Sequence, residues 1–275
     1  MFDTFVFILS KGFMQRAIIG GIFISLCASL LGVSLVLKRY SMIGDGLSHV
    51  GFGTIALATA LGWAPLAVSI PVVVITAFLL LRMGENSSIK GDAAVAIVST
   101  GSLAVGIIAS SLTTGMNQDF NNYMFGSILG LGKSDVILSV AVSIPVLTLF
   151  ILFYNKIFAV TFDENFSKAT GVKTGFYNAL VAVLTALIIV IGMRLMGALL
   201  ISSLVIFPSL TAMRICRTFK SVVLVSGIVS VVCFLAGIFA SIMIENMPTG
   251  ASIVAANIIC FILFSLIGKI KQSSK

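Results

Sequence analysis

Residues 17–53 read AIIGGIFISLCASLLGVSLVLKRYSMIGDGLSHVGFG, and two kinds of segment meet within them. An uninterrupted apolar run ends at Leu37 and is closed by two basic residues. A glycine-rich stretch follows, and it carries Asp45 and the single histidine of the chain, His49. The apolar run has the length of a membrane span. The sequence therefore predicts a membrane helix followed by an unusually polar one.

The composition of the whole chain is typical of a membrane protein. Of its 275 residues, 59% are hydrophobic and 9% are charged, and the mean hydropathy is +1.19, whereas soluble domains are about a quarter charged. Apolar runs near the spanning length of roughly 20 residues lie at Ala17–Leu37, Asp45–Leu61, Ala64–Leu81, Asp92–Leu112, Asp135–Tyr154, Thr174–Gly192, Leu195–Met213, Ser221–Ile244 and Ala251–Gly268. These runs predict an all-α polytopic membrane protein with eight or nine spans. We expect residues 1–275 to form a single membrane domain, with Met1–Arg16 lying at the membrane interface.

The seventeen basic residues are distributed unevenly once these runs are placed. Thirteen fall on one side of the membrane, and only Lys11, Arg16, Lys133 and Arg194 fall on the other. Because basic residues accumulate on the inner side, the C-terminus is expected in the cytoplasm and the protein in the cytoplasmic membrane. Nine spans put the N-terminus outside, and eight put it inside. This orientation explains the net charge of +8, and we assign the chain no nucleic-acid partner.

Asp45 and His49 are the candidate metal ligands. They are four residues apart, so on a helix their side chains share one face, and a carboxylate with an imidazole makes half of a metal site. Gly44 and Ser48 beside them leave room for a passing ion. A charge near the bilayer centre costs about 2.5–3.5 kcal/mol on insertion scales, which favours a functional role. The alternative is that Asp45 caps its helix and His49 bonds a carbonyl.

Two ligands are too few for tight binding, and weak ligation suits a conduction path because the ion must also leave. Two copies of the chain facing each other would supply two carboxylates and two imidazoles. Borderline ligands of this kind suit Zn²⁺ or Mn²⁺ better than Ca²⁺ or Cu⁺. The pattern therefore predicts Zn²⁺ or Mn²⁺ as a transported ion and no permanently bound cofactor.

The longest cytoplasmic loop, residues 155–173, has the signals of a helix outside the bilayer. These signals are the capping-box sequence Thr161-Phe162-Asp163-Glu164 with Thr161 as the cap, the apolar positions Phe162, Phe166 and Ala169 on one face, and the stop residue Gly171. We expect a helix of about nine residues within 161–171 that docks into a groove of another protein. The alternative is a surface helix packed against its own membrane domain.

Other motifs are weaker. Gly132-Lys133-Ser134 resembles the end of a phosphate loop, but that motif needs a glycine five positions before Gly132, where this chain has Ser127. We therefore predict no nucleotide-binding loop. The four cysteines are scattered through apolar runs without CxxC pairing, and we interpret them as packing residues.

Pro208 lies inside the run Leu195–Met213. A proline removes one helix hydrogen bond and kinks a span, and the nearby Ser202, Ser203 and Ser209 can satisfy the freed groups. Bent helices rich in small residues often line pathways, although more often they only pack.

Five motifs, in this order, resemble the membrane subunit of ATP-binding-cassette importers for divalent transition metals, the zinc/manganese permease family. They are Gly44–His49, Phe125–Gly130, Asp163–Gly171, Ala198-Leu199-Leu200 through Phe207-Pro208, and Pro248-Thr249-Gly250-Ala251. The resemblance covers nearly the whole chain. The family commonly has alanine where this chain has Gly46, and aspartate where it has Glu245. Neither position is a candidate ligand.

The resemblance implies a homodimeric permease that works with two cytoplasmic ATP-binding subunits. It also implies an extracytoplasmic metal-binding protein that delivers the ion. In that scheme Asp45 and His49 line the ion path, and Phe162–Thr170 is a coupling helix that transmits ATPase closure. The chain itself would then be no enzyme, because hydrolysis takes place on the partner.

Two other function classes were weighed. A secondary, proton-coupled cation carrier would use a relay carboxylate, for which Asp45 is available, and usually an inverted repeat, which the sequence does not show. An intramembrane aspartyl protease would need Gly-x-Gly-Asp, but Met42 occupies the first glycine position. The carrier is thus the runner-up, and an enzyme is disfavoured.

Overall fold

The structure is a computed structural model that describes residues 11–86, 91–113, 126, 132–244 and 247–273. Nine helices of 18 residues or more lie within these ranges: α2 (Gly12–Leu37), α3 (Ile43–Ala60), α4 (Pro65–Asn86), α5 (Gly91–Leu112), α7 (Lys133–Leu152), α10 (Thr174–Met196), α11 (Ala198–Ile215), α12 (Phe219–Met243) and α13 (Thr249–Ser273). Two short helices, α8 (Tyr154–Phe162) and α9 (Glu164–Ala169), lie between α7 and α10. The fold is all-α, as the sequence predicts.

Seven of the nine long helices are apolar enough to cross a membrane on length and composition alone. The other two are α4, whose apolar part is the shorter segment Pro65–Leu81, and α3, which begins with the polar stretch around Asp45. The chain is a multi-pass protein of the cell membrane. Its helices agree with the predicted spans.

Two boundaries differ from the prediction. α2 begins at Gly12, so residues 12–16 continue the first span instead of lying apart from it at the interface, and residues 1–10 are outside the described part. α10 runs on to Met196, and the break before α11 falls at Gly197, whose φ of 88° and ψ of 156° belong to a region reached essentially by glycine alone. The predicted runs place this break slightly earlier, between Gly192 and Leu195, because the apolar pattern does not fix its exact position when both helices are apolar on either side of it.

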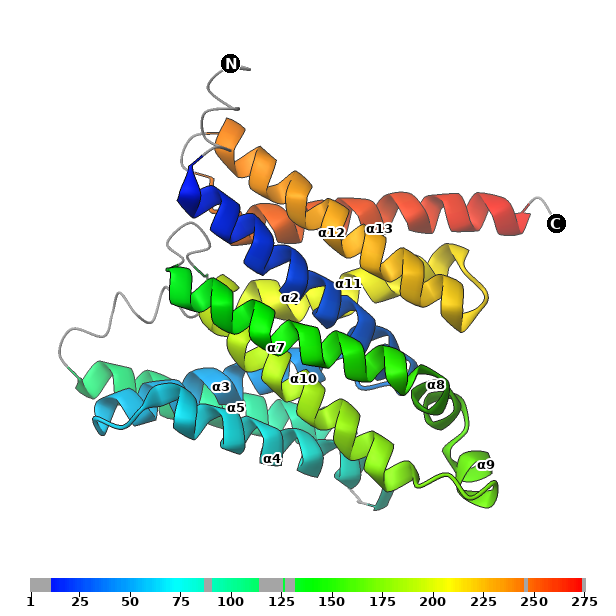
Figure 1. The fold of residues 1–275 in the computed structure, drawn as a ribbon, viewed down its shortest axis with the longest axis horizontal. Helices are drawn as coiled ribbons and strands as arrows, with labels where there is room; N and C mark the ends of the chain where they lie inside the picture. The colour runs from blue at the N-terminus through cyan, green and yellow to red at the C-terminus, as the bar shows by residue number, and fades with distance from the viewer. Residues whose placement is uncertain (1–10, 87–90, 114–125, 127–131, 245–246, 274–275) are drawn as a thin grey trace.

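The long helices run roughly along one direction of the molecule (Figure 1). α9 and the end of α13 lie at one end, whereas α2 begins at the other. With an odd number of spans, the first helix begins and the last helix ends on opposite sides of a membrane. This arrangement fits nine spans better than eight, and the exact number of spans stays a prediction.

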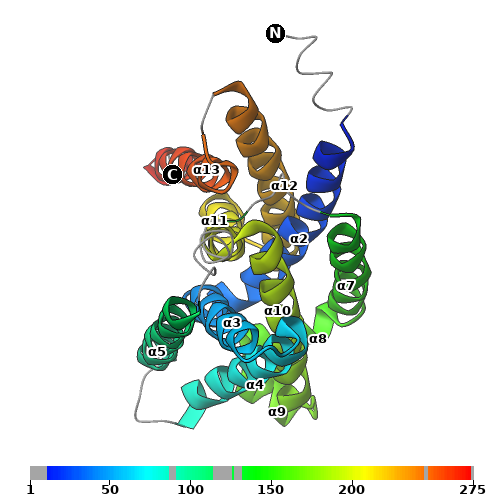
Figure 2. The ribbon, with the colours of Figure 1, turned by 90° about the vertical axis from the view of Figure 1, so that its left-hand side faces the viewer.

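Seen from the side that faces left in Figure 1, the helices form two groups with α2 and α10 between them (Figure 2). One group is α3, α4 and α5, and the other is α11, α12 and α13. Over their most apolar windows α2, α10 and α11 are 67%, 72% and 61% buried, whereas α7 and α13 are 22% buried. The first three form the centre, and the last two lie at the periphery with most of their side chains outside the packed interior.

Small residues allow the central helices to approach closely. A Cβ on Gly32 would lie 2.0 Å from the Val205 carbonyl oxygen, so α2 and α11 touch backbone to backbone there. The hydroxyl of Ser209 donates to the Ser29 carbonyl at 3.2 Å, and that of Ser230 donates to the Ser25 carbonyl at 2.9 Å. The four cysteines are free, and Cys27 and Cys233 are buried in this packing.

Candidate metal path and coupling helix

The first turns of α3 hold the candidate ligands. Asp45 lies in the first turn, where a carboxylate suits the positive end of the helix dipole. One turn later His49 brings its Nε2 to 3.6 Å from Asp45 Oδ2. The His49 side chain is 15% exposed and that of Asp45 is 38% exposed. Two polar side chains at helical spacing thus meet on one face, as the sequence predicts.

α11 supplies a further polar group, Ser202. Its hydroxyl donates to Asp45 Oδ1 at 3.4 Å and to its own helix at the Ala198 carbonyl at 2.8 Å. It also lies 3.4 Å from the Ser48 hydroxyl, which donates to the Asp45 carbonyl at 2.7 Å. Gly44 of α3 packs against Val205 of α11, because a Cβ at this glycine would lie 3.5 Å from the Val205 side chain. The polar cluster therefore lies between α3 and α11.

The sequence does not predict that Ser202 lies beside Asp45. The serine was assigned to satisfying backbone groups freed by Pro208, and its bond to Ala198 is such a backbone bond. Its second contact, to Asp45, needs a neighbour 157 residues away. No feature of the sequence near Ser202 signals this contact.

The imidazole of His49 has one nitrogen without a hydrogen-bond partner among the described residues. Nδ1 is this buried nitrogen, while Nε2 faces Asp45. Buried polar atoms are nearly always hydrogen-bonded, so an orphaned one calls for an explanation. A neutral imidazole nitrogen is also a common ligand for transition metals. The arrangement can contribute one oxygen and one nitrogen to a passing cation.

One chain offers these two ligands and no larger set. Among the described residues, no three of His, Cys, Asp and Glu lie close enough to hold a metal ion together. Structural zinc sites use four protein ligands, and catalytic ones use three. The pair within one chain is therefore suited to transient ligation.

Pro208 lies inside α11, which continues through it to Ile215. Next to it, Ser209 donates to the carbonyl of Val205 at 3.1 Å. A kink at Pro208 and a place for it on the pathway stay predictions.

The cytoplasmic segment is built differently from the prediction. Thr161 does not cap the outer helix, because it belongs to α8, which ends at Phe162. The cap is Asp163, whose Oδ1 accepts the Phe166 backbone N–H at 2.8 Å. α9 consequently has six residues instead of nine, and Phe162 does not share a helical face with Phe166.

The end of α9 is as predicted. Gly171 has a φ of 82°. Its N–H donates to the Lys168 carbonyl at 3.1 Å, and the next N–H, of Val172, donates to the Ser167 carbonyl at 3.0 Å. This is the Schellman pattern, in which a glycine reverses the chain and satisfies the last carbonyls of the helix. Ala169 is the last residue of the helix and is exposed.

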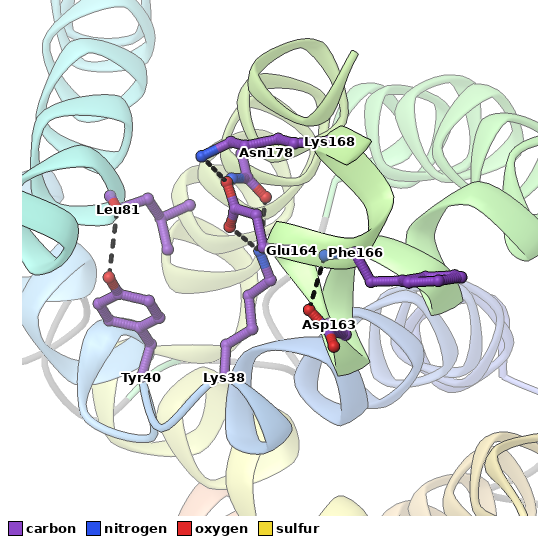
Figure 3. Close-up of polar contacts among 8 residues, drawn as sticks. All are labelled: Lys38, Tyr40, Leu81, Asp163, Glu164, Phe166, Lys168 and Asn178. Carbon is purple, nitrogen blue, oxygen red and sulfur yellow. Dashed lines mark hydrogen bonds and ion pairs between the residues drawn. The ribbon is translucent and has the colours of Figure 1, made fainter. Parts of the chain in front are cut away.

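α9 has two distinct faces. Phe166 is 66% exposed and points away from the membrane helices, whereas Glu164 points inward, toward Lys38 and Asn178 (Figure 3). Phe162 is 61% exposed, but its ring packs at a tilt against Phe158 within α8 and edge to face against Phe219 of α12. One face of this segment thus packs on the protein's own membrane helices, as the alternative expects, and docking of the exposed Phe166 into another protein stays a prediction.

Comparison with known proteins identifies the family. The model of the ABC 3 transport family matches residues 10–268. The chain belongs to the ABC 3 transport family. Because that family is one of ATP-binding-cassette transporters, membership supports the permease prediction over the secondary carrier.

Three similar proteins extend this finding to the full length of the ABC 3 chain. The manganese import system permease protein ScaB of Streptococcus gordonii is 30% identical over 91% of this chain and 90% of its own. The high-affinity zinc uptake system membrane protein ZnuB of Haemophilus influenzae is 29% identical over 90% and 94%, respectively. A solved structure of PsaBC from Streptococcus pneumoniae in complex with Fab has a TM-score of 0.85, with 29% identity over 96% of this chain and 95% of that one.

Some of the motifs that suggested the family can be located in this ABC 3 structure. Within Phe125–Gly130 only Gly126 is described, and a Cβ on it would lie 2.0 Å from the Met196 carbonyl oxygen. That glycine thus packs against the break between α10 and α11, directly before the helix that carries Ser202. Glu245 lies outside the described residues.

Proposed function

We propose that this chain is the membrane-spanning subunit of an ABC importer that carries Zn²⁺ or Mn²⁺ into the cell past Asp45 and His49. The main support is the meeting of these two side chains at 3.6 Å inside the helix bundle, with the buried His49 Nδ1 left without a hydrogen-bond partner in the described part of the chain. Relatives named for manganese import and for zinc uptake support a divalent transition metal as the cargo.

Two copies of the chain would complete the ligand set. One copy contributes one carboxylate and one imidazole, and a symmetric pair contributes four ligands around a shared axis. Four ligands at distances longer than those of a tight metal site replace the water around the cation for a short time. They release the cation when the two copies move apart. The Ser202 hydroxyl, 3.4 Å from Asp45 Oδ1, orients the carboxylate toward the path.

Energy would come from a cytoplasmic ATP-binding subunit docked at α9. The exposed Phe166 and the six-residue helix held by Asp163 and Gly171 form a small, rigid projection. An aromatic side chain on such a projection suits a pocket of a partner protein. An extracytoplasmic metal-binding protein would deliver the ion at the opposite end of the bundle.

The experiment replaces each ligand in turn. Asp45→Ala and His49→Ala should each abolish metal uptake by cells or proteoliposomes that contain the ATP-binding subunit, with membrane insertion unchanged. The matched control is Asp135→Asn. Asp135 is also a carboxylate in the first turn of a long helix, but it pairs with Arg194 at 3.4 Å. Wild-type uptake by both ligand variants would exclude the proposed path.

A further inference from the structure

Glu164 connects α9 to two membrane helices at once. Its Oε2 lies 3.4 Å from Lys38 Nζ and accepts the Asn178 amide N–H at 3.1 Å. Lys38 Nζ in turn donates to Asn178 Oδ1 at 2.5 Å, which closes a triangle of three side chains (Figure 3). The three come from α9, from the end of α2 and from the first turns of α10.

This triangle is largely removed from water. The side chains of Lys38 and Glu164 are 18% and 22% exposed. Exposed ion pairs contribute little because water screens them, whereas partial burial strengthens both the attraction and the cost of leaving one partner alone. A second cation, Lys168, lies 3.1 Å from the other oxygen of Glu164, but it is 53% exposed and belongs to α9 itself. Lys38, in contrast, joins this carboxylate to a different helix of the membrane domain.

Lys38 leads directly to the candidate ligands. It is the C-cap of α2, and α3 begins five residues later at Ile43, two positions before Asp45. The turn between them is tight: Arg39 has a φ of 64°, and the next N–H, of Tyr40, donates to the Leu35 carbonyl at 2.9 Å. A short turn held by such backbone hydrogen bonds transmits a displacement instead of absorbing it.

A hydrogen bond to α4 also holds the α2–α3 turn, and two cavities adjoin the triangle of Lys38, Glu164 and Asn178. The Tyr40 hydroxyl donates to the Leu81 carbonyl of α4 at 3.1 Å (Figure 3). Glu164 and Asn178 line two cavities, of about 280 Å³ and about 360 Å³. Since apolar packing does not fill this region, polar contacts carry the connection between α9 and the turn.

We propose that Lys38, Glu164 and Asn178 form a link through which α9 sets the position of the α2–α3 turn and hence of Asp45. They are positioning residues, distinct from Phe166, which faces the partner. This inference rests on the proposed function, because it assigns the route by which ATPase closure reaches the proposed metal path.

The test replaces each of the two lysines that contact the Glu164 carboxylate by glutamine. Lys38→Gln removes the partner on α2, and Lys168→Gln, the matched control, removes the partner within α9. The complex of each variant with the ATP-binding subunit is reconstituted in vesicles, and the number of Mn²⁺ or Zn²⁺ ions imported per ATP is measured. Lys38→Gln should lower this ratio roughly five-fold or more, and Lys168→Gln should lower it less. Both variants should still bind the ATP-binding subunit, and Lys38→Arg should restore coupling.

A second readout does not depend on the metal. Spin labels at Asn165 and Met42, both exposed and on α9 and the α2–α3 turn respectively, are introduced after the native cysteines are replaced. Their separation should stay constant during ATP turnover in the wild type and in Lys168→Gln, and it should change in Lys38→Gln.

The outcomes separate the two proposals. A wild-type ratio and a constant spin-label separation in Lys38→Gln would overturn the link, and so would equal losses in Lys38→Gln and Lys168→Gln. If Lys38→Gln fails to fold, Asn178→Ala removes the same triangle from α10 and must reproduce the uncoupling. A wild-type complex that hydrolyses ATP but imports neither metal would instead overturn the proposed function, and the spin-label separation would still decide the link.

Discussion

At the level of single residues, the candidate path depends on two side chains that face each other and on one that the sequence could not assign. Asp45 and His49 are separated by one helical turn, so their meeting follows from the period of the helix. Ser202 approaches Asp45 from another helix, and nothing in its local sequence encodes that neighbour. The candidate ligands of one chain are one carboxylate oxygen, which is a hard ligand, and one imidazole nitrogen, which is a borderline ligand.

This pair of ligands gives a prediction about metal preference. His49→Asp replaces the imidazole by an oxygen ligand, and oxygen-rich sites suit Mn²⁺ better than they suit Zn²⁺. Zinc import should fall by about tenfold more than manganese import, an effect of the size seen when a metal ligand environment is altered. Competition uptake with both metals measures this ratio. An unchanged zinc-to-manganese ratio would mean that His49 does not contact the ion.

At the level of elements, α9 shows how packing overrides a local signal. Thr161 and Asp163 are both good helix caps, and the spacing from Thr161 to Glu164 favoured the first. Phe162 instead continues α8, because its ring packs against Phe158 one turn earlier and meets Phe219 of α12 edge to face. The start of α9 therefore moves to Asp163.

The observed cap yields a prediction. Asp163→Ala removes the acceptor of the Phe166 N–H, and losing a cap costs about 1 kcal/mol, a large share of the stability of a six-residue helix. Affinity for the ATP-binding subunit should fall about five-fold, as measured by titration of the purified proteins in detergent. Asp163→Asn, which keeps the capping oxygen, should bind nearly as the wild type does. Equal affinities for the alanine variant and the wild type would show that the cap does not hold the docking surface.

The close contact between α2 and α11 gives a prediction about stability. A Cβ on Gly32 meets the Val205 backbone oxygen at 2.0 Å, and a backbone atom cannot rotate away. Gly32→Ala should lower thermal stability in detergent by about 1–3 kcal/mol, the usual effect of overpacking. Gly101 in α5 meets nothing within 4 Å, so Gly101→Ala is the matched control and should leave stability unchanged or raise it. A melting temperature for Gly32→Ala at or above that of the wild type would contradict this packing.

At the level of the whole molecule, the polar cluster lies where the two helix groups meet. α3 belongs to one group and α11 to the other (Figure 2). The Ser202 hydroxyl of α11 donates to Asp45 of α3 and so bridges them. A movement of one group against the other therefore changes the surroundings of Asp45. The triangle of Lys38, Glu164 and Asn178 connects the same region to the cytoplasmic end.

The proposed shared site can be tested with two copies joined in one chain by a long flexible linker. If the ligands of both copies surround one ion, His49→Ala in either half alone should reduce metal uptake almost as strongly as the double variant does. Independent paths would instead leave about half of the uptake when one half is altered. Uptake by the four forms, including the unmodified fusion, distinguishes these results.

The sequence by itself determined the membrane spans, the side on which basic residues gather and the common face of Asp45 and His49. These features depend on apolar length, charge distribution and helical period, which are local properties of the chain. Only the tertiary structure decided that Ser202 lies beside Asp45, 157 residues away, and that Glu164 pairs with Lys38, 126 residues away. Such contacts arise from the packing of distant helices, in which close approach at small residues, and not local propensity, selects the neighbours.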